Sequence, residues 1–169
     1  VEDGTTAGKQ MKSPLDLKAE GASVRDDYGV MSGKGAHGDI TLENVRVPVE
    51  NLIGEEGKGF YQVMDALETG RVNIAARAVG VAQAAFDDAL AYSLQRETFG
   101  ELISERQAIQ FMLAEMATKI QAARLLTYDA ASKKDSGDRF DLEAGMAKLY
   151  ASEICAEVTL DAMRVHGGV

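Results

Sequence analysis

Residues 67–111 constrain the fold more than any other part of the chain. The segment begins with a long alanine-rich run in which apolar residues recur three and four positions apart, and this spacing predicts a helix that buries one face. The recurring positions are Val72, Ala75, Ala76, Val79, Ala82, Gln83, Phe86, Leu90 and Leu94. Gly100 is expected to stop this helix, and Ser104 with Gln107 is a candidate capping box for the next helix.

The same period continues to the end of the chain and predicts three long helices, over about 59–95, 105–134 and 142–165. Short connections make neighbouring helices antiparallel. We therefore expect a mostly α fold, a truncated up-and-down four-helix bundle whose fourth helix lies past Val169. Expected inward-facing residues are Phe86, Leu90, Met112, Met116, Ile120, Met146, Leu149, Ile154, Val158 and Met163.

The N-terminal part of the chain has a different composition. Residues 1–38 are rich in Gly, Ser, Lys and Asp, and they read as loop or short strand. Residues 39–43 alternate polar and apolar side chains, as a half-buried strand does, and Pro48 follows them. A glycine-studded linker at 51–59 then places a domain boundary between 1–51 and 52–169.

Composition excludes several classes of function. The net charge of −9 argues against binding to nucleic acid or to an anionic membrane surface, although an anionic cofactor at one site stays open. No apolar run reaches the ~20 residues of a membrane span. The single Cys155 fits a reducing compartment. The polar start of the chain gives no sign of a signal peptide. Because the sequence does not start with Met, we expect an excised piece of a longer protein.

The sequence also argues against three common kinds of functional site. Residues 33–38 have the spacing of a dinucleotide fingerprint, but a strand-like segment follows them where a helix is required, so we interpret them as a glycine-rich turn. Neither His37 nor His166 has a Glu three residues before it, which argues against a di-iron site, and no metal site is expected. No Ser or Cys lies in a nucleophile elbow.

The remaining candidate site is the turn between the first two helices, which contains Arg96, Phe99 and Gly100. Arg96 could complement a helix dipole and Phe99 could anchor the core. Alternatively, the arginine fork grips a phosphate, the ring lies against a cofactor, and Gln107 serves the same ligand. Composition does not decide between these interpretations.

Six spaced motifs point to one family. They are GEEGKGF (54–60), LETGR (67–71), RETFG (96–100), QAIQF (107–111), AARLLTY (122–128) and VHGG (165–168). In this order, they resemble the C-terminal half of an acyl-CoA dehydrogenase, over about 39–169. Residues 1–51 would then be a remnant of that family's middle β-domain with its linker, and 52–169 an incomplete C-terminal helical bundle domain.

The resemblance implies a flavin-dependent enzyme that converts an acyl-CoA thioester to a trans-2-enoyl-CoA, with hydride transfer to FAD. It also implies a homo-oligomer, dimer or tetramer, and an electron-transfer acceptor. The residues that match the family's FAD contacts are Arg96, Phe99, Gln107, Arg164, Val165, His166, Gly167 and Gly168. Those that match its substrate contacts are Glu68, Thr69, Gly70 and Arg71. The family more often has Asp at the position of Glu68 and Gln at that of Arg164.

The catalytic base is expected outside the chain. In most members it is a Glu beyond the glycine pair, which here would lie past Val169. A minority place it directly before the arginine that matches Arg71, but that position is Gly70, which has no side chain. Glu68 is two residues away and points to nearly the opposite side of the helix.

Two alternatives accompany this interpretation. One is a non-catalytic helical module that keeps the bundle for oligomerisation or interaction. The other, within the same class, is an oxidase that passes electrons to oxygen. For the dehydrogenase we expect the cytoplasm of a bacterium or a mitochondrial matrix.

Overall fold

The computed structural model describes residues 18–30 and 33–168. The chain divides into two compact units, Val1–Met64 and Asp65–Val169, and the division falls inside the first long helix, α1 (Gly59–Ser93). The boundary that the sequence suggests at 51/52 stays a prediction. No helix in the described part of the chain has both the length and the apolar character needed to cross a membrane.

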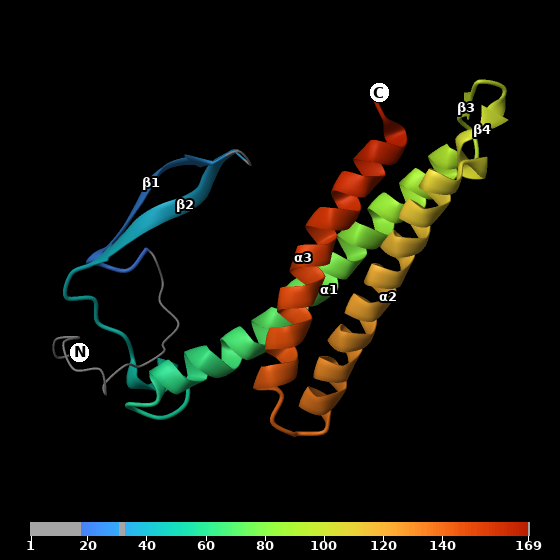
Figure 1. Cartoon of the computed structure of the whole chain (residues 1–169). Helices are drawn as coiled ribbons and strands as arrows, with labels where there is room; N and C mark the ends of the chain where they lie inside the picture. The colour runs from blue at the N-terminus through green and yellow to red at the C-terminus, as the bar shows by residue number, and fades with distance from the viewer. Residues whose placement is uncertain (1–17, 31–32, 169) are drawn as a thin grey trace. The chain divides into compact units, whose positions relative to one another are not determined.

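The first unit contains a two-stranded antiparallel sheet of β1 (Ala22–Val30) and β2 (Gly33–Leu42), drawn in blue in Figure 1. Val24 lies opposite Ile40 in the register. The strand expected at 39–43 is therefore confirmed, although it begins at Gly33. The glycine-rich turn expected at 33–38 is wrong, because backbone pairing with β1 needs no side chain and tolerates glycine in a two-stranded ribbon.

The chain leaves this sheet through a short irregular segment. A single 3-10 turn, η1 (Val49–Asn51), follows Pro48, whose fixed φ of −55° suits the start of a helical turn. Gly54 and Gly57 follow with φ of 78° and 80°, in the left-handed region that favours glycine. The linker that the sequence suggests at 51–59 has this irregular backbone up to residue 58, and α1 begins at Gly59.

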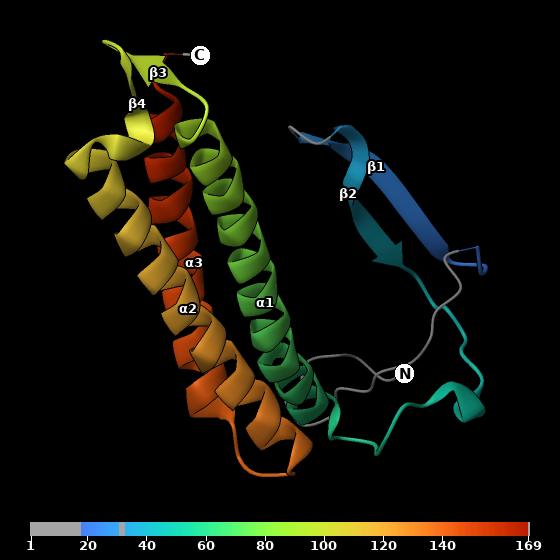
Figure 2. The same cartoon turned by 90° about the vertical axis from the view of Figure 1, so that its right-hand side faces the viewer.

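Three long helices run up and down along one another: α1, α2 (Gln107–Asp135) and α3 (Asp141–His166), as Figures 1 and 2 show. Their bounds lie within two residues of those expected, and the mostly helical fold is confirmed. The turn between α2 and α3 contains Gly137, with φ of 77°, whose N–H donates to Lys134 O at 3.0 Å. Gly167, with φ of 74°, ends α3, as the glycine pair predicts.

The connection between α1 and α2 differs from the sequence interpretation. It is a small hairpin of β3 (Glu97–Thr98) and β4 (Glu101–Leu102), followed by one 3-10 turn, η2 (Ile103–Glu105). Gly100 therefore does not stop the helix: α1 already ends at Ser93, and Gly100 forms the tip of the hairpin.

The capping box expected at the start of α2 is also wrong. The N-cap residue of α2 is Arg106, and no side chain caps the helix there. Ser104 lies inside η2, so its hydroxyl is not at the N-cap position. Its carbonyl oxygen instead accepts a hydrogen bond from Gln110 Nε2 at 3.0 Å, which ties η2 to the first turn of α2.

The core is a heptad-like seam on each helix. Buried positions recur in steps of three, four or seven residues, which is the pattern of coiled-coil packing. The buried residues are Ala75, Val79, Ala82, Ala89 and Ser93 on α1, Leu113, Met116, Ile120, Ala123, Thr127 and Ala130 on α2, and Ala144, Ala147, Ala151, Ile154, Val158, Ala162 and Val165 on α3. Many are alanine, and small side chains let helix backbones approach closely.

Most of the expected core is confirmed, with one clear error in helix phase. Met116, Ile120, Ile154 and Val158 are buried, and Phe86, Leu90 and Met112 are half-buried against the core. Leu149 is 61% exposed, and Met146 and Met163 are also exposed, so their predicted burial is wrong. The seam of α3 passes through Ala147 and Ala151, and a residue two positions from each points away from it.

Polar contacts fix the helices to one another. Lys133 Nζ of α2 lies 2.5 Å from Glu143 Oε1 of α3. The hydrogen bond from Lys133 holds the pKa of Glu143 below its ordinary value, and the pKa of Lys133 is raised by the same bond. Between α1 and α2, Arg124 Nη2 donates to Gln83 Oε1 at 2.6 Å.

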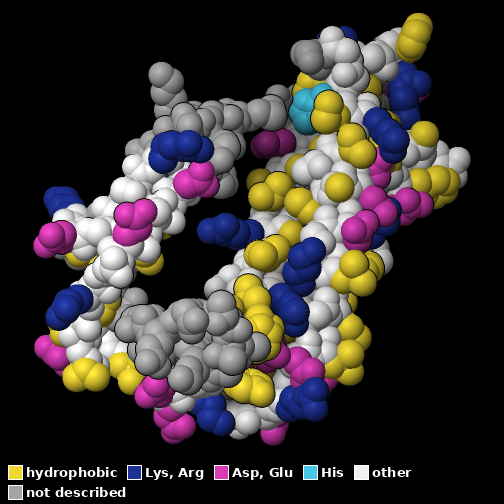
Figure 3. Space-filling model, turned by 90° about the vertical axis from the view of Figure 1, so that its left-hand side faces the viewer, with side chains coloured by type: hydrophobic (Ala, Val, Ile, Leu, Met, Phe, Trp, Pro, Cys, Tyr) yellow, Lys and Arg dark blue, Asp and Glu magenta, His cyan; other side chains and the backbone are white. Residues whose placement is uncertain are grey.

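Each of the three helices also carries a second, exposed apolar stripe. Figure 3 shows hydrophobic side chains along the visible helical face. On α1 the stripe is Phe60, Leu67, Ile74 and Val81, on α2 it is Phe111, Leu125 and Tyr128, and on α3 it is Leu142, Met146, Leu149, Leu160 and Met163. Exposed apolar surface that follows a helix over this length is typical of an interface.

Candidate functional site

The ends of α1 and α3 and the hairpin between α1 and α2 enclose a hollow of about 370 Å³. Its lining residues are Tyr92, Arg96, Thr98, Ile103, Val165, His166, Gly167 and Gly168. Five of them, Arg96 and Val165 to Gly168, are residues that the sequence resemblance assigns to FAD. Residues about 70 positions apart in the sequence therefore meet at one end of the bundle.

The backbone of Arg96 is fixed by two hydrogen bonds, while its side chain is available to bind a ligand. Its N–H donates to Tyr92 O at 2.9 Å, and its carbonyl oxygen accepts from Ile103 N–H at 2.9 Å. The side chain is exposed, and no described residue forms an ion pair or hydrogen bond with the guanidinium. A fixed backbone with an unpaired guanidinium is suited to binding an anion, above all a phosphate, which the planar fork can grip with two donors.

The last turn of α3 forms the opposite wall of the hollow. The ring of His166 stacks on that of Tyr92, with centroids 4.5 Å apart and the planes inclined by 26°. His166 Nδ1 lies 2.9 Å from Ala162 O, one turn earlier. A Cβ added to Gly167 or Gly168 would meet no heavy atom within 4 Å, so the backbone there is open to close approach by a ligand.

Phe99 lies on the tip of the hairpin and does not line the hollow. Phe99 and Gly100 both have positive φ, 55° and 82°, which is the pattern of a type I′ turn. This region suits glycine, but a bulky residue held there costs about 1–3 kcal/mol. The side chain of Phe99 is 100% exposed, so core burial does not compensate for that cost.

The other two residues that resemble FAD contacts lie elsewhere. Gln107 is exposed on the first turn of α2 and does not line the hollow. Arg164 lines a second groove, between α2 and α3, and its Nη1 lies 2.6 Å from Asp161 Oδ1. Arg164 and His166, two residues apart, were both expected to contact FAD, but they line different hollows. The helical period explains it, since two residues rotate the side chain by about 200°.

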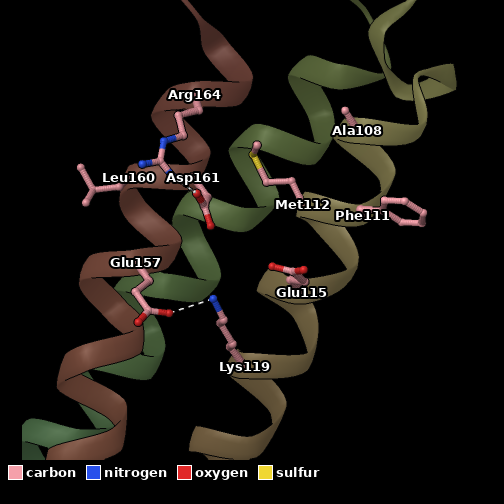
Figure 4. Close-up of a pocket in the computed structure, with 9 residues that line it drawn as sticks. All are labelled: Ala108, Phe111, Met112, Glu115, Lys119, Glu157, Leu160, Asp161 and Arg164. Carbon is pink, nitrogen blue, oxygen red and sulfur yellow. Dashed lines mark hydrogen bonds and ion pairs between the residues drawn. The ribbon is translucent and has the colours of Figure 1, made fainter.

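The second groove measures about 520 Å³, and Figure 4 shows the residues that line it. Lys119 of α2 and Glu157 of α3 meet across it at 2.8 Å. The hydrogen bond from Lys119 to Glu157 raises the pKa of the lysine. Exposed Phe111 and Leu160 lie on its sides, so the groove combines apolar walls with paired charges. Sequence reasoning missed this groove, because its residues come from two helices whose relative register the sequence does not state.

The residues that resemble substrate contacts lie far along α1 from the hollow. Glu68 is half-buried, while Arg71 is exposed. Gly70 has open space where a Cβ would lie, so no described atom accounts for a glycine there. Twenty-five helical residues separate Glu68 from Ser93, which is about 37 Å at 1.5 Å per residue.

The turn between α2 and α3 contributes charge near Glu68. Arg139 forms a bidentate pair with Asp141, with Nε–Oδ1 at 2.6 Å and Nη2–Oδ2 at 2.9 Å. The hydrogen bond to Asp141 is the main reason that the pKa of Arg139 is raised, and the negative charge of Glu68 adds to it. In the same pair, the pKa of Asp141 is lowered by its hydrogen bond from Arg139.

Three lining residues of the hollow were not singled out from the sequence: Tyr92, Thr98 and Ile103. Tyr92 precedes Arg96 by four positions, so an aromatic residue one turn before the arginine was the available signal. Thr98 had no comparable signal, because its place depends on the hairpin. Among the described residues, no group of three or more His, Cys, Asp or Glu side chains could hold a metal ion.

Comparison with known proteins gives a consistent result. A family model described as "Acyl-CoA dehydrogenase, C-terminal domain" matches residues 57–169. The chain is 48% identical over 155 residues to the caffeyl-CoA reductase-Etf complex subunit CarC of Acetobacterium woodii, covering 91% of this chain and 41% of that protein. It is 46% identical over 155 residues to a 3-(aryl)acrylate reductase of Clostridium sporogenes, again covering 91% of this chain and 41% of that protein.

Solved structures agree with these relatives. The structure of butyryl-CoA dehydrogenase from Megasphaera elsdenii matches with a TM-score of 0.87 and 36% sequence identity, covering 99% of this chain and 44% of that one. The chain therefore spans about two fifths of the length of the curated relatives it matches.

Proposed function

Because the chain belongs to the acyl-CoA dehydrogenase family, over that family's C-terminal domain, we propose that the whole protein is an FAD-dependent acyl-CoA dehydrogenase. It would remove the α-proton of an acyl-CoA thioester and transfer the β-hydrogen as hydride, giving a trans-2-enoyl-CoA. Bound FAD supplies the hydride acceptor, and the protein supplies orientation and electrostatics. Residues 57–169 contribute part of the nucleotide site and part of the substrate site.

The observation that carries this proposal is the hollow around Arg96. An unpaired guanidinium faces a hollow whose other wall has open glycine backbone and a stacked imidazole ring. This donor set fits a diphosphate joined to flat rings, which is the chemistry of FAD. Arg96 would bind the diphosphate, and Gly167 and Gly168 would let it approach the backbone.

The distance along α1 supports a homo-oligomer. The residues that resemble substrate contacts begin at Glu68, about 37 Å of helix from the end of α1 beside the hollow. We propose that Arg96, together with Phe99 and Gln107, contacts the FAD of a neighbouring subunit, while residues 68–71 contact the subunit's own substrate. The exposed apolar stripes supply surface for a neighbouring subunit and for a fourth helix.

The proton acceptor is proposed to lie outside residues 1–169. Gly70 has no side chain at the position where a minority of the family place the base. Glu68 is rotated by about 200° from it on the helix. Glu68 also lies within electrostatic reach of Arg139 of the turn between α2 and α3. We assign Glu68 to substrate binding.

An electron-transfer flavoprotein is the electron acceptor that we propose. The Acetobacterium woodii relative is named as a subunit of a caffeyl-CoA reductase-Etf complex. The lone cysteine, Cys155, supports a reducing compartment, which is the cytoplasm in a bacterium and the mitochondrial matrix in a eukaryote.

A non-catalytic interaction module is the second candidate. The three exposed apolar stripes favour it, because oligomerisation alone would account for them. The two candidates differ in flavin content. The enzyme purifies with bound FAD or takes it up when FAD is added, whereas the module does neither.

The test is FAD binding by the intact protein with Arg96→Lys. Lysine keeps the charge but loses the planar fork, so we expect binding about tenfold weaker, or ~1.4 kcal/mol. Arg77→Lys is the matched control, because Arg77 is an exposed arginine of α1 outside the proposed sites. Flavin content that survives dialysis equally in wild type and Arg96→Lys would exclude the proposed role of Arg96.

A further inference from the structure

The tip of the β3–β4 hairpin holds an aromatic residue in a conformation that disfavours it. Phe99 has φ of 55°, next to Gly100 at 82°. Glycine adopts this region freely, whereas a bulky side chain stays there only when its surroundings hold it. The ring of Phe99 is 100% exposed, so packing does not hold it in place.

The side chain of Arg106 contacts this turn in two ways. Its Nη2 donates to the carbonyl oxygen of Thr98, the residue before Phe99, at 2.6 Å. Its Cζ lies 5.7 Å from the centroid of the Phe99 ring, within the range of a cation–π contact. One guanidinium therefore contacts both the backbone that enters the turn and the ring on its tip.

Arg106 is itself fixed in place. It is the N-cap residue of α2, and its backbone N–H donates to Ile103 O at 3.1 Å. Its carbonyl oxygen accepts from Ile109 N–H at 2.9 Å and from Gln110 N–H at 3.1 Å. The side chain thus extends from the start of a long helix, which is a rigid support compared with the two-residue strands of the hairpin.

We propose that Arg106 is a positioning residue that holds the hairpin turn and so presents the ring of Phe99 to the flavin nucleotide. The proposal rests on the proposed FAD-binding function. Arg106 does not line the hollow and acts through Phe99. A guanidinium can donate in its plane while its face lies against a ring, whereas the ammonium of lysine is a point charge without a flat face.

The first experiment measures FAD binding by the intact protein after removal of its flavin. Arg106→Gln should weaken binding about tenfold, as should Phe99→Ala, because both remove the presented ring from its place. The double variant should bind no more weakly than Phe99→Ala alone, since the two residues act as one unit. Arg106→Lys should restore little of the affinity, and Arg77→Gln, an exposed control on α1, should change nothing.

The second experiment needs no FAD. Amide hydrogen exchange of residues 99–103 should become about tenfold faster in Arg106→Gln, because opening of the hairpin then costs less free energy. Exchange in the middle of α3 should not change, and Arg77→Gln should match wild type throughout.

Two results would overturn the proposal. One is unchanged exchange at residues 99–103 in Arg106→Gln. The other is a double variant whose loss of FAD affinity is the product of the two single losses, which means that the residues act independently. A wild-type protein that binds no FAD would refute the proposed function instead, and hydrogen exchange alone would then decide whether Arg106 holds the turn.

Discussion

Replacing Ile154 with alanine should destabilise the helical unit strongly, whereas the same replacement of Leu149 should have little effect. Both residues lie on α3, and both were expected to be buried from the apolar spacing. In the structure Ile154 is 3% exposed and lies in the seam, and Leu149 is 61% exposed on the outer stripe. The pair therefore tests the helix phase with nearly the same chemistry at two positions.

The magnitude follows from the carbons that are removed. Each substitution deletes three carbon atoms, and burial is worth about 0.8 kcal/mol per CH₂ group, or ~2.4 kcal/mol in total. At Ile154 a cavity adds to this and the better helix propensity of alanine subtracts a few tenths, so we expect a loss of about 2–4 kcal/mol. At Leu149 only about two fifths of the side chain is buried, and the loss should stay below ~1 kcal/mol.

Urea unfolding of residues 1–169, followed by circular dichroism at several protein concentrations, measures both losses. Concentration dependence would reveal self-association through the exposed stripes, and the comparison should then be made at the lowest concentration. A cost for Leu149→Ala equal to or above that for Ile154→Ala would refute the seam described for α3. A loss of stability below ~0.5 kcal/mol in Ile154→Ala would also refute that seam.

Two other predictions concern charge and catalysis. The hydrogen bond from Lys133 lowers the pKa of Glu143, so this carboxylate stabilises the fold above its ordinary pKa of about 4.5 and loses that effect as pH falls through the lowered value. Glu143→Gln should therefore destabilise at pH 7 and much less at pH 3 in urea unfolding, and an equal loss at both would contradict the pairing. Residues 1–169 expressed alone should turn over no acyl-CoA of any chain length with excess FAD and an artificial electron acceptor, because no base is proposed in them. Turnover that Glu68→Gln abolishes would identify Glu68 as the base.

Helix positions were well predicted from the sequence because the period of apolar residues is a local property of the chain. The same period was too coarse to choose between two apolar stripes on one helix. On α3 the buried stripe is made largely of small residues such as Ala147 and Ala151, while the larger Leu149 and Met163 lie outside. From side-chain size alone, the larger residues were expected to be buried. The expectation was wrong because the close approach of α2 and α3 favours alanine at their contact.

The candidate site was predicted unevenly for a similar reason. Arg96 and residues 165–168 were named from motifs, and the structure brings them together at one hollow. The place of Tyr92, the stacking of His166 and the hairpin that carries Phe99 depend on how the ends of α1 and α3 meet. Those contacts join residues far apart in sequence, so no local pattern states them. Arg106 was missed because its role depends on the hairpin.

Reduction of the flavin by substrate tests the central proposal most directly. The intact protein, loaded with FAD and kept free of oxygen, should be mixed with acyl-CoA thioesters of several chain lengths and with aryl-substituted ones. If the protein is an acyl-CoA dehydrogenase, at least one thioester should bleach the visible absorption of the oxidised flavin and give the corresponding 2-enoyl-CoA in equal amount. A flavin that stays oxidised with every thioester, or a protein that takes up no FAD, would contradict the account.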